Sequence, residues 1–407
     1  MNRPAFKNSE LGPIPVDWEV KRFDDVYSFA AAGDLQKGFY SPLKDSIHKY
    51  CIYSNGLSDK GLYGYTSHPR YKQNAITITG RGTLGHAEYR VEDFDAIIRL
   101  LILTPKGEVD NQFIVYWINY LRPFKHESTS IPQLTVPQVA CTSLPFPPLP
   151  EQRRIAVALS DADAWIESLD KLIEKKKLVK QGAMQALLSG KTRLPGFSGE
   201  WEDEVVGDAF VFLRTNTLSR SCLGETGCIS DVHYGDVLVR YGNILDFSAE
   251  TPPFIGEGHE SRSIGDFLQD GDLVVADTAE DETVGKAVEI QHLGNRQAVA
   301  GLHTVACRPK QPFAPGWLGH FINSPFFHDQ LLPLISGTKV SSISKENLKT
   351  VFVRRPPLAE QAAIASVLSG MDAELASLSR EKAKAEQIKQ GMMQELLTGR
   401  VRLAEGE

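Results

Sequence analysis

Three short motifs contain residue types that could do chemistry on nucleic acids or nucleotides. Thr251 to Phe254 reads Thr-Pro-Pro-Phe, but threonine lacks the amide or carboxylate with which a methyl-transfer loop accepts a target amine. Asp17 to Lys21 holds the acids and the lysine of a metal-dependent nuclease within five residues, too close together for the first acid to lie on a separate strand. Gly80 to Thr83 and Gly285-Lys286 leave the G-x-x-x-x-G-K-[ST] phosphate loop incomplete. We therefore expect no catalytic site and no nucleotide site in this chain.

The cysteines, the hydropathy and the charge exclude further classes of protein. The five cysteines form no C-x-x-C pair, so we expect neither a disulfide framework nor a metal site. No apolar run approaches the ~20 residues of a membrane span, and the polar N-terminus does not read as a signal peptide. We therefore expect a cytoplasmic protein without a membrane partner. The net charge of −7 lies mostly in residues 195–356, where 13 Lys+Arg minus 22 Asp+Glu gives −9.

An internal repeat is the strongest pattern in the sequence. At an offset of 209 residues, 148–194 matches 357–403 at 23 of 47 positions, whereas chance gives roughly one match in fifteen. Upstream the offset falls in steps: residues 116–119 match 320–323 at 204, and Trp18 matches Trp201 at 183. The extra residues of the second copy thus lie outside the segment that matches best. This pattern indicates variable domains on a constant scaffold.

The constant segments predict two long helices. Residues 151–189 and 360–398 lack proline, follow proline-rich stretches and end just before Gly190 and Gly399, which is typical of helix boundaries. Apolar residues in alternating steps of four and three predict that each helix packs against another. Lysines interrupt these apolar seams at positions 176, 180 and 382. Gly182 and Gly391 lie inside the helices, which predicts close approach of a second backbone.

The remaining residues indicate mixed α/β domains. Short β-rich runs at 75–79, 96–103 and 272–276 predict strands, and 111–121 and 315–323 predict helices. We therefore predict a two-fold internal repeat with the order α/β domain (1–147), helical segment (148–194), α/β domain (195–356) and helical segment (357–407).

This arrangement resembles the specificity (S) subunits of type I restriction-modification systems. The matching residues are the Pro-Leu-x-Glu-Gln starts at 148–152 and 357–361 and the Leu-Leu-x-Gly ends at 187–190 and 396–399, and the resemblance covers essentially the whole chain. It implies that each α/β domain is a target-recognition domain that reads one half of a bipartite site in double-stranded DNA. It also implies that the long helices pack antiparallel as a spacer, and that this chain is a non-catalytic subunit.

The resemblance implies partner subunits as well. Two methyltransferase (M) subunits would bind the helices and carry S-adenosylmethionine, and restriction (R) subunits would carry ATP and Mg²⁺, so no cofactor is expected on this chain. The residues expected to bind partners lie near both ends of each helix: Glu151, Gln152, Ile155, Leu159, Gln181, Met184, Leu188, Glu360, Gln361, Ile364, Leu368, Gln390, Met393 and Leu397. If the helices act as a ruler, equal insertions after Lys176 and Ala385 should widen the gap between the half-sites.

In the first domain, a glycine-rich loop and an aromatic segment are candidates for DNA contact. Glycine lets the backbone approach phosphates, and side chains such as arginine read base edges. In the loop 79–86, Arg81 could bind a guanine or a phosphate, and Thr83 and His86 could bind a phosphate; a solvated hairpin is the alternative. Upstream, residues 63–73 alternate aromatic and basic side chains and are a second candidate for DNA contact. Packing in the core explains the tyrosines of this run equally well. The candidate residues are Tyr65, Arg70 and Lys72.

In the second domain, the equivalent loop 277–286 is acidic. Either its acids accept hydrogen bonds from cytosine or adenine amines, or Lys286 contacts DNA while the acids face solvent. The other candidates in this domain are Arg240, Asn243, Thr283, Lys339 and Ser341. Because a charge of −9 opposes phosphate binding, we expect the partner subunits to supply much of the neutralising charge.

Two other functions stay open on the sequence. The acidic second domain favours a helical scaffold whose paired domains bind protein ligands. A self-sufficient methyltransferase-nuclease is opposed by the length and the missing motifs. The glycine-rich loops and the resemblance favour DNA recognition over both.

Overall fold

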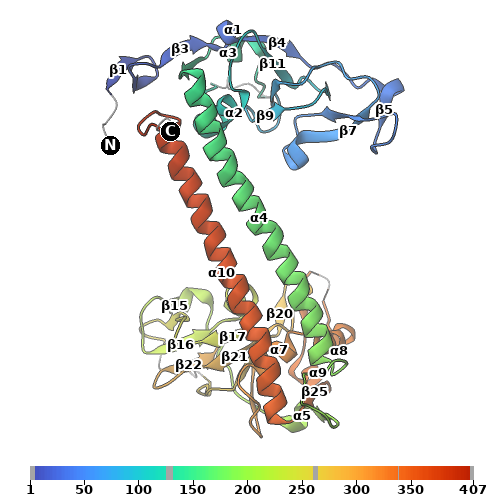
Figure 1. The fold of residues 1–407 in the computed structure, drawn as a ribbon. Coiled ribbons are helices and arrows are strands. Elements are labelled where there is room, and N and C mark those ends of the chain that lie inside the picture. The colour runs from blue at the N-terminus through green and yellow to red at the C-terminus, as the bar shows by residue number, and fades with distance from the viewer. Residues whose placement is uncertain (1–4, 125–131, 260–264, 338, 404–407) are drawn as a thin grey trace. The chain divides into compact units, whose positions relative to one another are not determined.

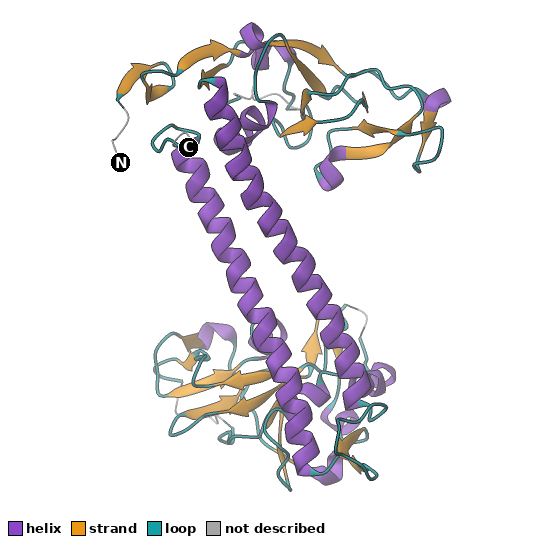
Figure 2. Cartoon of the chain, viewed as in Figure 1, coloured by secondary structure: helices purple, strands orange, loops and turns teal. Residues whose placement is uncertain are grey.

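The structure is a computed structural model that describes residues 5–124, 132–259, 265–337 and 339–403. The chain divides into two compact units, residues 1–170 with 380–407, and residues 171–379. Each unit contains one α/β domain, the start of one long helix and the end of the other. Figure 2 shows that strands and loops make up most of the chain outside these two helices.

The long helices are α4 (Leu149–Leu188) and α10 (Leu358–Leu396), labelled in Figure 1. They confirm the predicted helices, with each boundary within two residues. Gly190 and Gly399 follow the helix ends at φ of 71° and 69°. This left-handed backbone is the conformation that favours glycine at a helix C-terminus.

In each unit, the start of one long helix packs with the end of the other. The core of the first unit contains Ile155 and Leu159 from the start of α4, and Leu396 and Leu397 from the end of α10. The core of the second unit contains residues 187 and 188 of α4 and residues 364 and 368 of α10. The two helices therefore run antiparallel, and the predicted fold class is confirmed.

The three lysines that interrupt the apolar seams, and Lys389 of α10, pair with acids of the opposite helix. In the second unit, the ion pairs are Lys176 with Glu374 and Lys180 with Asp372; in the first, they are Lys382 with Asp170 and Lys389 with Asp163. Such pairs are weak individually in solvent. They nonetheless oppose a slipped register, because a shift along the helix would separate all the pairs of that unit.

The prediction of close backbone approach at Gly182 and Gly391 is wrong. Among the described residues, no atom outside each glycine's own helix backbone lies within 4 Å of a Cβ placed at either position. Both glycines face open space, so glycine at these positions is a cost to helix stability without a packing contact that requires it.

The first domain is built from two four-stranded sheets. One has the strand order β4 (Tyr27–Ala31), β11 (Leu101–Pro105), β8 (Ala75–Ile78), β9 (Ala87–Arg90), and the other β10 (Asp95–Ala96), β6 (Tyr50–Tyr53), β7 (Leu62–Thr66), β5 (Tyr40–Ser41). Smaller pairs are β1 (Phe6–Ser9) with β2 (Gly12–Pro15), and β3 (Glu19–Arg22) with β12 (Ser143–Phe146). The helices are α1 (Phe23–Val26), α2 (Asn111–Leu121) and α3 (Val136–Ala140). Buried residues of α2 join β8 and β11 to the start of α4 in one core.

The second domain also has two sheets, one of which has five strands instead of four. Its five-stranded sheet has the order β14 (Phe210–Phe212), β23 (Thr304–Pro309), β19 (Leu273–Ala276), β21 (Ala287–Gln291), β17 (Ile244–Asp246). A second sheet has the order β15 (Leu223–Gly224), β18 (Phe254–Ile255), β16 (Ile229–Val232), β22 (Gln297–Ala300). Pairs are β13 (Glu202–Val205) with β25 (Phe352–Arg355), and β20 (Thr278–Ala279) with β24 (Ser341–Ser342). The helices are α5 (Val206–Ala209), α6 (Tyr234–Val239), α7 (Trp317–Ile322), α8 (Pro325–Leu331) and α9 (Lys345–Leu348).

One predicted strand is wrong in its extent. The run 96–103 was expected to form a single strand, but β10 ends at Ala96 and β11 begins at Leu101. Between them, Ile98 and Arg99 have φ of 57° and 56°, a conformation that no strand tolerates and that is unusual for a β-branched residue. The apolar run therefore crosses from one sheet to the other.

No helix in the described part of the chain is both long enough and apolar enough to cross a membrane.

Candidate nucleic-acid interface

The Pro-Leu-x-Glu-Gln motif fixes each domain to its helix through a buried carboxylate. In the first unit, Glu151 is 2% exposed and accepts a hydrogen bond from Trp18 Nε1 at 3.0 Å. Arg402 donates to the same carboxylate. It also donates to Asp17 at 2.8 Å. The hydrogen bond from Arg402 lowers the pKa of Asp17. One arginine after α10 thus joins the start of α4 to the start of the domain.

The second unit repeats this arrangement. Glu360 is fully buried and accepts from Trp201 Nε1 at 3.0 Å. Arg193, which follows α4, donates to both oxygens of Glu360 at 2.5 and 2.6 Å. A buried carboxylate is costly unless it is paired and hydrogen-bonded, which explains why tryptophan and arginine accompany the glutamate in both copies.

The glutamine of the motif makes the second attachment. Gln152 Oε1 accepts from the backbone N–H of Asp110, just before α2, at 3.0 Å. Gln361 Oε1 accepts from the backbone N–H of Ala314, just before α7, at 2.9 Å. Both glutamines are fully buried. We call Gln152 and Gln361 the helix anchors, because each holds the domain helix against the start of a long helix.

Most of the residues predicted to bind partners lie in these cores. The ten that are no more than 2% exposed are Glu151, Gln152, Ile155, Leu159, Leu188, Glu360, Gln361, Ile364, Leu368 and Leu397. Of the other four, Gln181 and Gln390 are exposed, whereas Met184 and Met393 are half-buried. The structure thus gives the buried ten a role in the fold. Partner binding by any of the fourteen stays a prediction.

The glycine-rich loop of the first domain has a fixed backbone. Thr79 N–H donates to the His86 carbonyl at 2.9 Å, and His86 N–H donates to Thr79 Oγ1 at 2.9 Å. Asn55, which follows β6, accepts from the backbone N–H groups of Gly80 and Arg81 at 2.8 and 3.2 Å. The loop therefore presents its side chains from a held frame that links the two sheets of the domain.

The side chains of this loop differ in how far they are available to a ligand. Arg81 and Thr83 are exposed. Within the described residues, the Arg81 guanidinium makes no hydrogen bond or ion pair. His86 Nε2 lies 3.1 Å from Glu88 Oε1. A free guanidinium on a fixed backbone suits bidentate recognition of a guanine or a phosphate.

The predicted residues upstream have separate roles in the structure. Arg70 Nε donates to Asp95 at 2.6 Å, so its guanidinium braces β10 from inside the domain. Tyr65 is half-buried in β7, between β5 and β6. The Lys72 side chain is 83% exposed and pairs with Asp93 at 2.8 Å. Of the three, only Lys72 has a positively charged side chain that is mostly exposed to solvent.

The sheet that holds Tyr65 carries exposed side chains that the sequence analysis missed. We call residues 37–73, which form β5, β6 and β7, the aromatic-basic sheet, where six Lys+Arg minus two Asp gives +4. Lys37, Lys44 and Lys49 are exposed and, among the described residues, form no ion pair. Large apolar side chains lie exposed beside them: Phe39, Leu43, Ile47, Tyr50 and Tyr63. The sequence contained a signal for this surface, because the alternation of aromatic and basic residues extends upstream as far as Lys37.

In the second domain, the acidic loop and its lysine point in different directions. Glu280, Asp281 and Glu282 are exposed. Lys286 is half-buried and its ammonium donates to the carbonyls of Leu238 and Tyr241, at the end of α6, at 2.9 and 3.0 Å. Burial lowers the pKa of Lys286. The geometry therefore favours the first alternative for this loop, in which acids rather than the lysine meet the ligand.

The other predicted residues of this domain are divided between surface and interior. Because Ala279 of β20 pairs with Ser341 of β24, the exposed Lys339 lies near the acidic loop. Thr283 is exposed, and its N–H donates to Asp281 within that loop. Arg240 is exposed and donates to a backbone carbonyl at 3.1 Å. Asn243, however, is half-buried with Nδ2 3.0 Å from His320 Nδ1, so it contacts the interior.

A buried carboxylate lies in β16 of this domain. Asp231 is fully buried, and its Oδ2 accepts from Asn216 Nδ2 at 2.6 Å. Its Oδ1 has no hydrogen-bond partner among the described residues. Burial raises the pKa of Asp231 to about 6.

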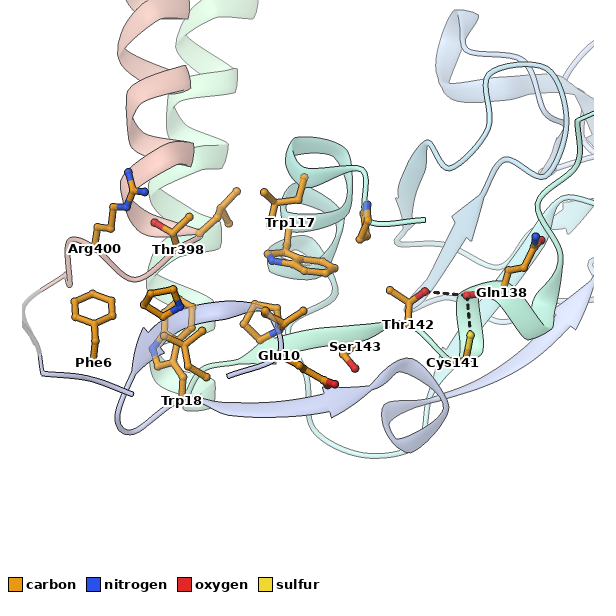
Figure 3. A pocket seen from close by; sticks show the side chains of 17 residues that line it. Phe6, Glu10, Trp18, Trp117, Gln138, Cys141, Thr142, Ser143, Thr398 and Arg400 are labelled. Carbon is orange, nitrogen blue, oxygen red and sulfur yellow. Dashed lines mark hydrogen bonds between the residues drawn. The ribbon is translucent and has the colours of Figure 1, made fainter. Parts of the chain in front are cut away.

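A cavity of about 1120 Å³ opens in the first unit beside the end of α10. Figure 3 shows Trp18, Trp117 and Phe6 among its lining residues. The lining includes none of the residues predicted to contact DNA. This cavity therefore adds nothing to the candidate interface. In the described part of the chain, no group of three or more His, Cys, Asp or Glu side chains is arranged to hold a metal ion.

The fold and these surfaces define a duplicated recognition protein, with two anchored α/β domains that each present exposed polar loops. Residues 15–177 match the family model described as the type I restriction modification DNA specificity domain. The chain is 24% identical to the type I restriction enzyme MjaVIII specificity subunit of Methanocaldococcus jannaschii, over 98% of this chain and 96% of that protein. It is 27% identical to the EcoKI specificity subunit of Escherichia coli, over 38% of this chain and 32% of that protein.

Solved structures share the fold. The crystal structure of a type I restriction-modification S subunit from M. genitalium superposes with a TM-score of 0.60 at 16% identity, covering 97% of this chain and 99% of that chain. A chain from a structural study of complex assembly in the type I R-M system has a TM-score of 0.57 at 17% identity. The match covers 95% of this chain and 99% of that chain. The resemblance predicted from the repeat is confirmed: the family model and the full-length matches of this chain are those of type I restriction-modification specificity subunits.

Proposed function

We propose that this chain is the sequence-specific DNA-recognition subunit of a type I restriction-modification complex, in which each α/β domain reads one half of a bipartite site. The observation that carries the proposal is the duplication of the whole recognition unit. Each copy joins its domain to the helices through the same Glu-Gln motif, while the exposed loops differ between copies. A constant attachment with variable loops is what reading two different half-sites requires.

The exposed side chains supply a physical route to DNA. The aromatic-basic sheet and Arg81 offer cations for phosphates and a guanidinium for a guanine. In the second domain, exposed acids can accept hydrogen bonds from cytosine N4 or adenine N6, and Lys339 can meet a phosphate. The acidic second domain implies weak DNA binding by the isolated chain, with partner subunits neutralising part of the backbone charge.

The chain itself acts without catalysis in this proposal. M subunits bring S-adenosylmethionine and methyl transfer, and R subunits bring ATP, Mg²⁺ and cleavage. We propose two M subunits, because the helical segment occurs twice in the chain and each copy offers an equivalent surface to the same partner. Large apolar side chains exposed on the long helices offer contacts outside the cores: Val157, Trp165, Leu172, Leu178, Val179, Val367 and Ile388.

Methylation mapping tests the function directly. The chain is expressed with its M subunit in a host that lacks other methyltransferases, and the methylated positions are mapped across the genome. We expect one bipartite motif with two defined half-sites and a fixed gap. Methylation without a bipartite motif, or a complex that binds protein ligands and no DNA, would contradict the proposal.

A further inference from the structure

Two matched polar clusters join the recognition domains to both long helices. In the first unit, the cluster comprises Tyr116 of α2, Ser160 and Asp163 of α4, and Lys389 of α10. Tyr116 OH donates to Asp163 Oδ2 at 2.6 Å and lies 3.2 Å from Ser160 Oγ. Lys389 pairs with the other oxygen of Asp163, 5.4 Å from the centre of the Tyr116 ring. Three elements therefore meet at one carboxylate.

The second unit contains the equivalent cluster at equivalent positions. His320 of α7 replaces the tyrosine, with Nε2 3.0 Å from Ser369 Oγ and Nδ1 3.9 Å from Asp372 Oδ2. Lys180 of α4 pairs with Asp372. The serine, aspartate and lysine correspond to those of the first cluster at the offset of 209 residues, and His320 corresponds to Tyr116 at 204.

The clusters lie on the same face of each helix as the anchors. Gln152 and Asp163 are 11 residues apart, as are Gln361 and Asp372. Eleven residues make about three turns of an α-helix and span about 16 Å, so both side chains face the same domain helix. The cluster thus adds a polar contact about 16 Å along the helix from the anchor, and two contacts so far apart resist tilting of the domain more than one contact does.

Burial indicates that the polar cluster belongs to the fold of each unit rather than to its surface. Tyr116 is 8% exposed and His320 is 1% exposed. The aspartate and lysine partners reach solvent, with Asp163 44% and Lys389 21% exposed. The ion pair alone is therefore weak, and the buried aromatic residue is the member that seats the domain.

We propose that Tyr116 and His320 are positioning residues that set the tilt of each recognition domain on the helix pair, and thereby determine which gap between half-sites the protein accepts. This inference rests on the proposed function. The reading side chains stay unchanged when a cluster is broken, but the domain tilts more easily about its anchor. Sites with a gap one base pair too long or too short then become accessible.

The test uses the complete complex of this chain with its M subunit on a library of DNA sites. The library keeps both half-sites and varies the gap by up to about two base pairs, each of which advances the duplex by roughly 3.4 Å. Tyr116→Phe removes the hydroxyl and keeps the ring. We expect methylation at the wrong gaps to rise roughly tenfold relative to the preferred gap, as loss of a hydrogen bond to a charged group predicts. The half-site bases should not change.

Three variants make this result specific. Tyr116→His introduces the residue that serves in the second unit and should restore the narrow gap preference. Asp163→Asn provides the same test by a second route if Tyr116→Phe does not fold. Lys177→Met removes the surface ion pair with Glu174 on the same helix and should leave the gap preference as in the wild type.

The outcomes separate this inference from the proposed function. Folded Tyr116→Phe and Asp163→Asn complexes with the wild-type gap preference would overturn the role of the clusters. A wild-type complex that methylates no bipartite site would instead overturn the proposed function. A change in the half-site bases would make Tyr116 part of base reading, which also contradicts the inference.

Discussion

At the scale of single residues, the two buried glutamates at the helix starts depend on their partners, because a buried carboxylate is costly unless it is paired and hydrogen-bonded. Arg402→Met leaves Glu151 without its guanidinium partner, and removal of one member of a buried pair costs about 3–5 kcal/mol. We expect the free energy of unfolding of the first unit to fall by that amount, measured by denaturant titration. Arg193→Met should do the same to the second unit.

Arg400→Met is the control for this prediction. Arg400 is exposed and, within the described residues, forms no ion pair, so its loss should change stability by less than about 0.5 kcal/mol. Equal stability of the Arg402→Met and Arg400→Met proteins would contradict the role assigned to Arg402.

The free guanidinium of Arg81 makes a prediction about base reading. Arg81→Ala should cost about 1–3 kcal/mol of binding if the side chain pairs with a guanine, and should relax one base position in the first half-site. Methylation mapping measures this directly. A uniform loss across all sites that grows with salt would make Arg81 a phosphate contact, and an unchanged methylation profile would remove the loop from the interface.

Asp231 predicts how stability depends on pH. Burial raises its folded pKa to about 6 from an ordinary value of 3.8, so the folded state favours the protonated form. The stabilising contribution of Asp231 to the free energy of unfolding is fully present below pH 3.8 and is lost as the pH rises through 6. Asp231→Asn cannot ionise, so its free energy of unfolding should exceed that of the wild type at pH 8 by about 3 kcal/mol, and the difference should shrink toward pH 4.

His320 changes stability with pH in the opposite direction. Burial lowers its pKa to about 4 from 6.5, so its favourable contribution is present above pH 6.5 and is lost as the pH falls toward 4. The comparison between Asp231→Asn and the wild type cancels this effect, since both carry His320. A constant difference between the two proteins from pH 4 to 8 would contradict the raised pKa of Asp231.

Among the elements, those fixed by local patterns were predictable from the sequence and those fixed by distant pairing were not. The long helices followed from proline-free apolar periodicity and terminal glycines, and α2 matched its predicted bounds because its pattern is contained in 11 residues. The break between β10 and β11 depends on the left-handed backbone at Ile98 and Arg99, which no residue type there signals. The roles of Gln152 and Glu151 were also hidden, because their partners lie far away in the sequence.

The antiparallel helices change the design of the insertion experiment. Positions after Lys176 and Ala385 are equivalent in the repeat, but they do not face each other, because Lys176 pairs with Glu374. Insertions there would shift the stretch between them out of register and separate the pairs Lys176 with Glu374 and Lys382 with Asp170. Insertions after Lys176 and after Ala373 lie opposite each other and keep both pairs.

With the insertions placed opposite each other, four residues in each helix lengthen the spacer by about 6 Å. Since a base pair advances DNA by roughly 3.4 Å, the preferred gap should grow by one or two base pairs while the half-sites keep their bases. Methylation mapping of the double insertion provides the measurement. A folded, active complex with the original gap would show that the helices do not act as the ruler.

For the whole molecule, the duplication predicts the composition of the complex. At saturating M subunit, light scattering should give a mass equal to one copy of this chain plus two M subunits, because the repeat presents two equivalent surfaces. Truncation of Trp165 to alanine, an exposed residue on α4, tests whether the helix surface takes part and should weaken M binding. A saturated complex with a single M subunit would contradict the prediction.

The participation of Arg402, Leu396 and Leu397 in the first unit has a consequence for protein synthesis. The second unit uses one continuous stretch of chain, 171–379, whereas the first needs residues from both ends. At about 5–20 residues per second, the ribosome releases the last part of the first core roughly 10–50 s after residue 170. The domain made first therefore finishes folding last, and until then the nascent chain carries Glu151 without its arginine and an open apolar core for chaperones to cover.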